Sequence, residues 1–150
     1  MNTFTSKKAV LAVATLILVF AMHGSAAAPV LPNPVLYFIG AEAAEVNGKQ
    51  VIRYRFDVSN KEQYPDDMFA QSPALPPCGA NTKAARTWVD LYDQSGKRLN
   101  GFCALGKSAD LNGIWFALDD GVVPPSWVYI ELNDRKTNTK YKSNLCDTTL

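Results

Sequence analysis

Gln50-Val-Ile-Arg-Tyr-Arg-Phe-Asp-Val-Ser59 alternates between apolar and polar side chains. Every second residue from Ile52 onward is apolar, and Arg53 and Arg55 lie between them. Because successive side chains of a strand point to opposite faces, this pattern predicts a strand with one buried face. Asn47-Gly48, just before it, tolerates positive φ and suits a tight turn, so we predict a hairpin with the preceding apolar run.

The rest of the chain repeats this layout of short apolar or alternating segments bounded by turn residues. No stretch keeps a helical period for more than about two turns. About seven strands at spacings of roughly ten to fifteen residues predict an all-β fold, a single antiparallel two-sheet sandwich. Residues 60–79 are rich in Pro and polar residues and predict a long crossing loop, with a short edge strand at 68–70. The predicted strands are 35–42, 50–59, 87–93, 98–105, 114–118, 127–132 and 139–143.

The first 27 residues have the three-part layout of a secretory signal peptide. Lys7 and Lys8 precede an apolar run over 9–22, and small residues follow it. The run is too short for a convincing membrane span. We expect cleavage after Ala27 and a mature domain of residues 28–150, exported to the periplasm or outside the cell, with no transmembrane segment.

The only histidine, His23, falls inside this leader. The mature chain therefore lacks the base of a Ser-His or Cys-His pair and the commonest zinc ligand. Removing Lys7 and Lys8 from the fifteen basic residues leaves thirteen against fourteen acids, a balance that argues against nucleic acid as a partner. We expect a protein that is not an enzyme, with no cofactor, metal or catalytic residue.

Three cysteines remain after processing, and an oxidising compartment allows a disulfide to persist. Cys78 precedes one predicted strand and Cys103 lies in the next, so we predict a Cys78–Cys103 bridge. Cys146, in the last polar tail, is left over. It is either a tail thiol of no consequence or the link of a covalent dimer.

Three segments look distinctive enough to mark a family: 77–81, 86–93 and 101–105. With its strand count and alternation, the chain resembles, over residues 30–144, the immunoglobulin-like or fibronectin-type-III-like sandwich domains of bacterial exported proteins. The resemblance implies a two-sheet sandwich and no particular activity. Cys78 departs from the immunoglobulin bridge pattern, because it lies in a loop instead of an early core strand.

Two predicted strands carry aromatic rings interleaved with a carboxylate on the face away from the core. In 87–93 and in 127–132 the aliphatic residues alternate with these outward side chains. Such a face suits a sugar-stacking platform or a protein-binding patch, and two arginines of strand 50–59 can stack over the rings if they share it. The alternative is that core packing or the Pro-rich loops cover the rings. The predicted ligand-binding residues are Trp88, Asp90, Tyr92, Trp127, Tyr129, Glu131, Arg53 and Arg55.

Other functional interpretations rest on the loops and charges. The loops 73–81 and 119–126 suit a protein-interaction component or inhibitor. Asp90 and Glu131, or loop carboxylates that otherwise form turns, suit a histidine-free glycoside hydrolase. Paired aspartates at 66–67 and 119–120 have the oxygen chemistry of a calcium site but not its spacing. A positive rim on the last hairpin suits a solvated edge better than a nucleic-acid or lipopolysaccharide contact; it consists of Arg135, Lys136, Lys140 and Lys142.

Overall fold

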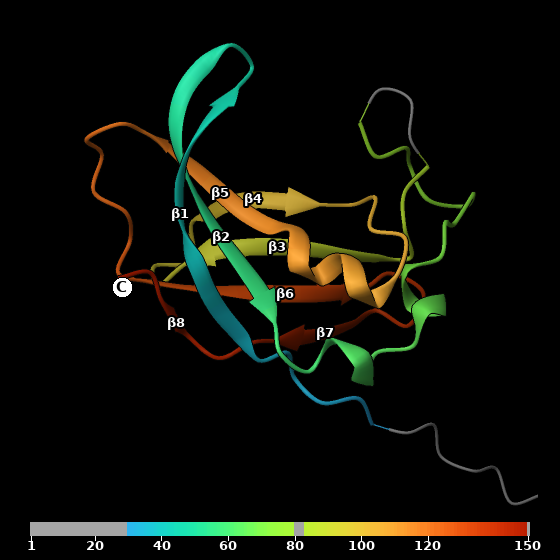
Figure 1. Cartoon of the computed structure of the whole chain (residues 1–150). Coiled ribbons are helices and arrows are strands. Elements are labelled where there is room, and N and C mark those ends of the chain that lie inside the picture. The colour runs from blue at the N-terminus through green and yellow to red at the C-terminus, as the bar shows by residue number, and fades with distance from the viewer. Residues whose placement is uncertain (1–29, 80–82, 150) are drawn as a thin grey trace, which may run out of the picture.

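The computed structural model describes residues 30–79 and 83–149, which form two antiparallel β-sheets packed face to face (Figure 1). The predicted signal peptide lies outside the described residues. One sheet has the order β1 (Leu36–Val46), β2 (Lys49–Val58), β5 (Ile114–Asp119). The other has the order β4 (Arg98–Phe102), β3 (Thr87–Asp93), β6 (Trp127–Asp134), β7 (Thr139–Lys142), and β8 (Cys146–Asp147) also pairs with β6. The predicted all-β, two-sheet antiparallel fold is confirmed.

The β1–β2 hairpin closes where the turn residues predicted it. Asn47 and Gly48 have φ values of 53° and 77°, and Val46 pairs with Lys49. Positive φ at both central positions matches the twist of the flanking strands. The register shifts between Phe38 and Gly40, so β1 carries a bulge. The strand runs to Val46, beyond the predicted end at residue 42, and the hairpin tip projects past the rest of the sandwich (Figure 1).

The core lies between the two sheets and is built from the inward side of each alternating strand. Phe56 and Val58 of β2 are fully buried, as are Val89 and Leu91 of β3. Burying one such side chain contributes about 1.5–3 kcal/mol. Equivalent inward residues of the other strands complete the core, among them Ile114, Phe116, Val128, Ile130 and Leu132.

The segment that crosses between the sheets contains short 3-10 helices, and the predicted edge strand at 68–70 is wrong. Met68 and Phe69 belong to η2 (Asp66–Phe69) and pack into the core. Three residues are too few to distinguish a strand from a turn of helix by periodicity. Two further 3-10 helices were not predicted, η1 (Lys61–Gln63) and η3 (Ser108–Gly113). Asp66 joins η2 to η3, because its Oδ1 accepts hydrogen bonds from the backbone N–H and hydroxyl of Ser108.

The predicted Cys78–Cys103 disulfide is present, with the two Cα atoms 5.5 Å apart. Cys103 lies just after β4 instead of inside the longer strand that we predicted. The bridge therefore ties the end of β4 to the loop that precedes β3.

Cys146 is free, as predicted, but its assignment to a polar tail is wrong. It lies in β8, pairs with Val128 and is buried. Burial, followed by the charge of Asp147, raises the pKa of the Cys146 thiol to about 11. The covalent dimer stays a prediction, and it now requires β8 to leave β6.

No helix within the described part of the chain is long and apolar enough to cross a membrane.

Candidate functional site

Six of the eight predicted ligand-binding residues lie on the outer face of the five-stranded sheet, which we call the outer face. Strands β3 and β6 are direct neighbours, so their outward side chains meet in rows. Trp88 is opposite Asn133, Asp90 is opposite Glu131, and Tyr92 is opposite Tyr129. The inward residues of both strands are fully buried, as the alternation predicted.

The two predicted tryptophans lie at opposite ends of this face. Trp127 is six residues before Asn133, the partner of Trp88, which places the two rings about 20 Å apart along the strands. Trp127 is 43% exposed, whereas Trp88 is half-buried and its Nε1 donates to the carbonyl of Ala85. The rings cannot form one stacking surface, and only Trp127 is open to solvent as predicted.

Tyr92 and Tyr129 form the aromatic centre of the outer face. Their rings stack with centroids 5.3 Å apart and an interplanar angle of 20°. The Lys142 ammonium of β7 lies 4.0 Å from the centroid of the Tyr129 ring, which is nearly buried. Desolvation, with the nearby charge of Asp90, raises the pKa of Tyr92, so its hydroxyl stays protonated at neutral pH. Tyr92 thus offers a ligand an aromatic ring that is held in place by stacking on Tyr129, and a hydroxyl group at its end.

The carboxylate of Asp90 is held by groups from two neighbouring strands. Arg98 Nε donates to Asp90 Oδ1 at 2.6 Å, and Asn133 Nδ2 donates to Oδ2 at 3.1 Å. Gly101 is opposite Asp90 in the register, and a Cβ there would lie 1.6 Å from Arg98 Nη2. The glycine leaves the space through which Arg98 reaches Asp90. The carboxylate is therefore oriented before any ligand arrives, which limits the entropy lost on binding.

A hollow of about 520 Å³ opens on the outer face beside these residues. Lys140, one of its walls, is an exposed side chain with its ammonium 3.5 Å from Glu131. Every lining side chain is polar or charged except for the Tyr92 ring, and together they offer both hydrogen-bond donors and acceptors. The lining consists of Asp90, Tyr92, Asn133, Asp134, Arg135, Asn138, Thr139 and Lys140.

Arg53 and Arg55 do not share this face, and the expectation that they do is wrong. Both belong to β2 and lie on the outer side of the three-stranded sheet, where they contact Glu42 at 3.7 and 3.6 Å. The Arg53 guanidinium stacks instead over Trp115, 5.1 Å from its ring centroid. Alternation within one strand fixes its two faces but does not say which sheet the strand joins.

The cations that do stack on the predicted rings come from the β6–β7 turn and β7. The Arg135 guanidinium lies 4.4 Å from the centroid of Trp88, and Lys142 covers Tyr129. The sequence had marked both residues only as part of a positive rim.

Arg86 and Asp134 form a buried ion pair that sequence patterning missed. Arg86 Nε and Nη2 donate to the two Asp134 oxygens at 2.8 and 2.6 Å, and the Asp134 side chain is only 2% exposed. Burial alone raises the pKa of Asp134, but hydrogen bonds from Arg86, Thr137 and the Lys136 N–H outweigh it and lower the pKa to about 2. The two residues are 48 positions apart, so no local pattern connects them.

Two further carboxylates at strand ends, Asp93 and Asp119, have structural partners. Asp93 Oδ1 accepts three hydrogen bonds, two from Ser95 and one from the Lys97 N–H, as expected of a turn former. Asp119 pairs with Lys49 at 2.7 Å. Within residues 30–79 and 83–149, no group of three or more His, Cys, Asp or Glu side chains is arranged to hold a metal ion.

Comparisons with protein-family models, curated proteins and solved structures find no match to this chain.

Proposed function

We propose that this chain is an exported, non-enzymatic binding module that recognises a carbohydrate through the outer face. The observation that carries the proposal is the 520 Å³ hollow, whose polar lining surrounds the Tyr92 ring. Sugars combine many hydroxyl groups with an apolar ring face. Oriented carboxylate, amide and ammonium groups can pair with the hydroxyls, while an aromatic side chain covers the C–H face.

The polar, concave lining favours a sugar over a protein surface at this position. Protein interfaces are centred on well-packed apolar or aromatic anchors, and charged residues are depleted there. Here Asp90, Asn133 and Lys140 line the hollow, and the exposed Trp127 lies at the far end of the outer face.

A protein-interaction role through loop 119–126 is the second candidate. Val122 and Val123 are 49% and 86% exposed, and they lie close in sequence to the exposed Trp127. Exposed apolar side chains that gather in one place favour a protein contact. Replacing both valines with serine should abolish capture of a protein partner and leave retention of a sugar unchanged.

The hydrolase alternative has a defined test on the same face. Asp90 and Glu131 are direct cross-strand neighbours, the arrangement of residue types that a two-carboxylate mechanism needs. Both oxygens of Asp90 already accept hydrogen bonds from Arg98 and Asn133. We expect no polysaccharide turnover by the mature protein. Turnover that stops in Asp90→Asn or Glu131→Gln would replace the binding proposal.

The strand order supports the finer assignment of the fold to the immunoglobulin-like and fibronectin-type-III-like sandwiches. In an immunoglobulin constant-type domain, strands A, B, E and D form one sheet and C, F and G the other. This chain has β1, β2 and β5 in one sheet and β3, β6 and β7 in the other, and β4 pairs with β3. The differences are therefore the sheet that the fourth strand joins and the short additional strand β8, which pairs with β6.

Glycan-array binding by the mature protein, followed by calorimetry with the best ligand, tests the proposal. Tyr92→Ala and Lys140→Ala should each weaken binding about tenfold or more, because each removes a ring or a charged donor from the hollow. Lys49→Ala is the matched control: its side chain is 65% exposed, against 67% for Lys140, and it also pairs with a carboxylate, but on the other sheet. Equal weakening by both lysine variants would contradict the site, and an array without any binding would contradict the function.

A further inference from the structure

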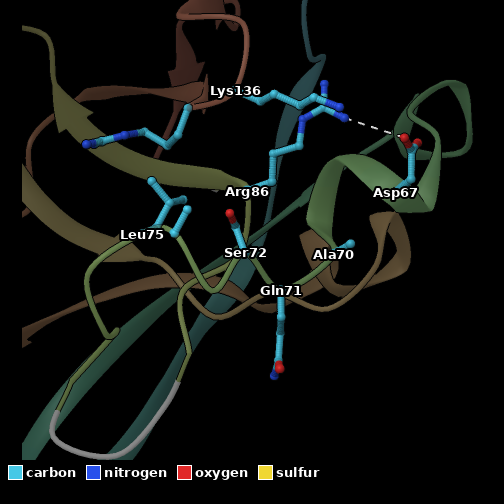
Figure 2. Close-up of a pocket in the computed structure, with 9 residues that line it drawn as sticks. Asp67, Ala70, Gln71, Ser72, Leu75, Arg86 and Lys136 are labelled. Carbon is cyan, nitrogen blue, oxygen red and sulfur yellow. Dashed lines mark hydrogen bonds and ion pairs between the residues drawn. The ribbon is translucent and has the colours of Figure 1, made fainter.

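A second hollow, of about 390 Å³, lies next to the first, at the junction of the 67–75 segment, the start of β3 and the β6–β7 turn (Figure 2). Arg86, Arg135 and Lys136 supply its positive charges, and Asp67 is the carboxylate that lines it. Arg135 also lines the hollow of the outer face. The two hollows therefore share Arg135 as a lining residue.

The positive charge of this second hollow is only partly compensated. Arg86 is engaged on two of its nitrogens by Asp134, which leaves Nη1 with a 3.4 Å contact to Asp67. Asp67 is 75% exposed, so this contact is weak. In the described part of the chain, no carboxylate lies within ion-pair distance of Arg135 or Lys136.

The side chains of Arg86 and Arg135, and the backbone of Lys136, are held in place by contacts within the protein. Asp134 accepts hydrogen bonds from the N–H of Lys136 and the hydroxyl of Thr137, and thereby orders the turn that carries Arg135 and Lys136. Arg135 is held further by its stacking on Trp88 and by its N–H, which donates to the carbonyl of Arg86. One buried carboxylate thus places Arg86 and organises the turn beside it.

The opposite wall carries the apolar side chains of the hollow, together with the hydroxyl of Ser72, and is fixed to the sheet. Leu75 and the hydroxyl of Ser72 face the charged groups, whereas Gln71 points away from them (Figure 2). Ala74 also lines this side of the hollow. The backbone of Ser72 donates to Ala84 and that of Arg86 donates to Ala70, which join this wall to the start of β3. A ligand group that fits must offer an anion on one side and carbon on the other.

We propose that the second hollow is an acidic subsite, which binds the carboxylate of a uronic acid residue in the oligosaccharide whose neighbouring sugar occupies the hollow of the outer face. The inference rests on the proposed carbohydrate function and names its ligand class. Guanidinium groups match the planar carboxylate in geometry, and the Leu75 wall covers the sugar ring beside it. Arg135, which lines both hollows, contacts the junction between the two sugars.

Calorimetry with two acidic probes and their neutral counterparts tests the subsite. The probes are tetragalacturonate and a hyaluronan tetrasaccharide, each compared with its methyl ester at low salt. We expect at least one acid to bind about tenfold tighter than its ester, the size expected of one charge-assisted hydrogen bond, and the excess to shrink as salt is added.

Variants of the lining residues show which side chains cause the preference for the acid over its ester. Arg135→Gln and Lys136→Gln should bring the affinity for the acid down to that for the ester, while Lys97→Gln, an exposed lysine of the β3–β4 turn, should keep the preference. Equal binding of acid and ester would overturn the subsite and leave the carbohydrate function standing. A preference that survives both hollow variants would also overturn it. Failure of the protein to bind any glycan would overturn the function itself, and the subsite with it.

Discussion

Asp134 is the residue on which both hollows depend. It lines the hollow of the outer face, fixes Arg86 in the second hollow and orders the turn that carries Arg135 and Lys136. A buried ion pair is a weak source of net stability, but breaking it leaves a charge without compensation. What Asp134 does between the hollows is to position Arg86 and the β6–β7 turn.

Asp134→Asn should destabilise the fold by about 2 kcal/mol at pH 7, because the folded pKa of about 2 lies well below the unfolded value of 3.8. A lowered folded pKa means that this stability is complete above pH 4 and is lost as pH falls toward 2. Urea unfolding should therefore show a gap between wild type and variant that closes over this range. Asp67→Asn, at the exposed 3.4 Å contact, is the control and should change stability by less than about 0.5 kcal/mol. A constant gap from pH 7 to pH 2 would contradict the assignment.

Trp127 should dominate the quenchable tryptophan fluorescence. It is 43% exposed, whereas Trp88 and Trp115 are half-buried beneath Arg135 and Arg53. Trp127→Phe should remove most of the emission that acrylamide quenches, and Trp115→Phe should leave that component in place. Uniform protection of all three rings in the wild-type protein would show that Trp127 is covered.

At the scale of the strand, the sequence predicts which side chains point inward and which point outward. It does not predict which strands pair with one another in a sheet. Alternation predicted the inward and outward sides of β2, β3 and β6 correctly, because a period of two is a property of the backbone alone. It left open whether Arg53 shares a face with Trp88, and the two do not share one, because β2 and β3 belong to different sheets. The pairing of Arg86 with Asp134 depends on the register of β3 with β6, which is set by long-range packing.

The shortest elements were the hardest to predict. β8 has two residues, and η2 replaced the edge strand expected at 68–70. Elements of this length follow from the packing of Met68, Phe69 and Cys146 into a core formed by other strands. Their own few residues carry no distinguishing period.

β8 controls access to the only free thiol in the described part of the chain. Cys146 is buried and its pKa is raised to about 11, so little thiolate forms at pH 8. Dithionitrobenzoate should react with the native protein far more slowly than with the protein in urea. Thr148→Ala, which removes the hydroxyl that donates to the carbonyl of Pro125, should speed the native reaction by loosening the docking of β8. Rapid labelling of the native wild type would contradict a docked β8.

At the scale of the whole molecule, the Cys78–Cys103 bridge restrains the long connection between the two sheets. It closes a loop of 25 residues, and the chain-entropy estimate gives a stabilisation of about 3 kcal/mol. Reduction should therefore lower the urea midpoint by a corresponding amount. The reductant should have no effect on the Cys78→Ala/Cys103→Ala variant, which is already without the bridge. An unchanged midpoint on reduction would show that the helices and the sheet contacts hold this connection on their own.

The projecting tip of the β1–β2 hairpin is a suitable site for attaching a label or for immobilising the protein on a surface. Asn47 and Gly48 form the tip, and neither hollow is lined by any residue of β1 or β2. A biotin or fluorophore attached through a cysteine inserted there would immobilise the sandwich in one orientation, with both hollows open to the solution. Surface-based screening of glycans can then start from a uniformly presented protein.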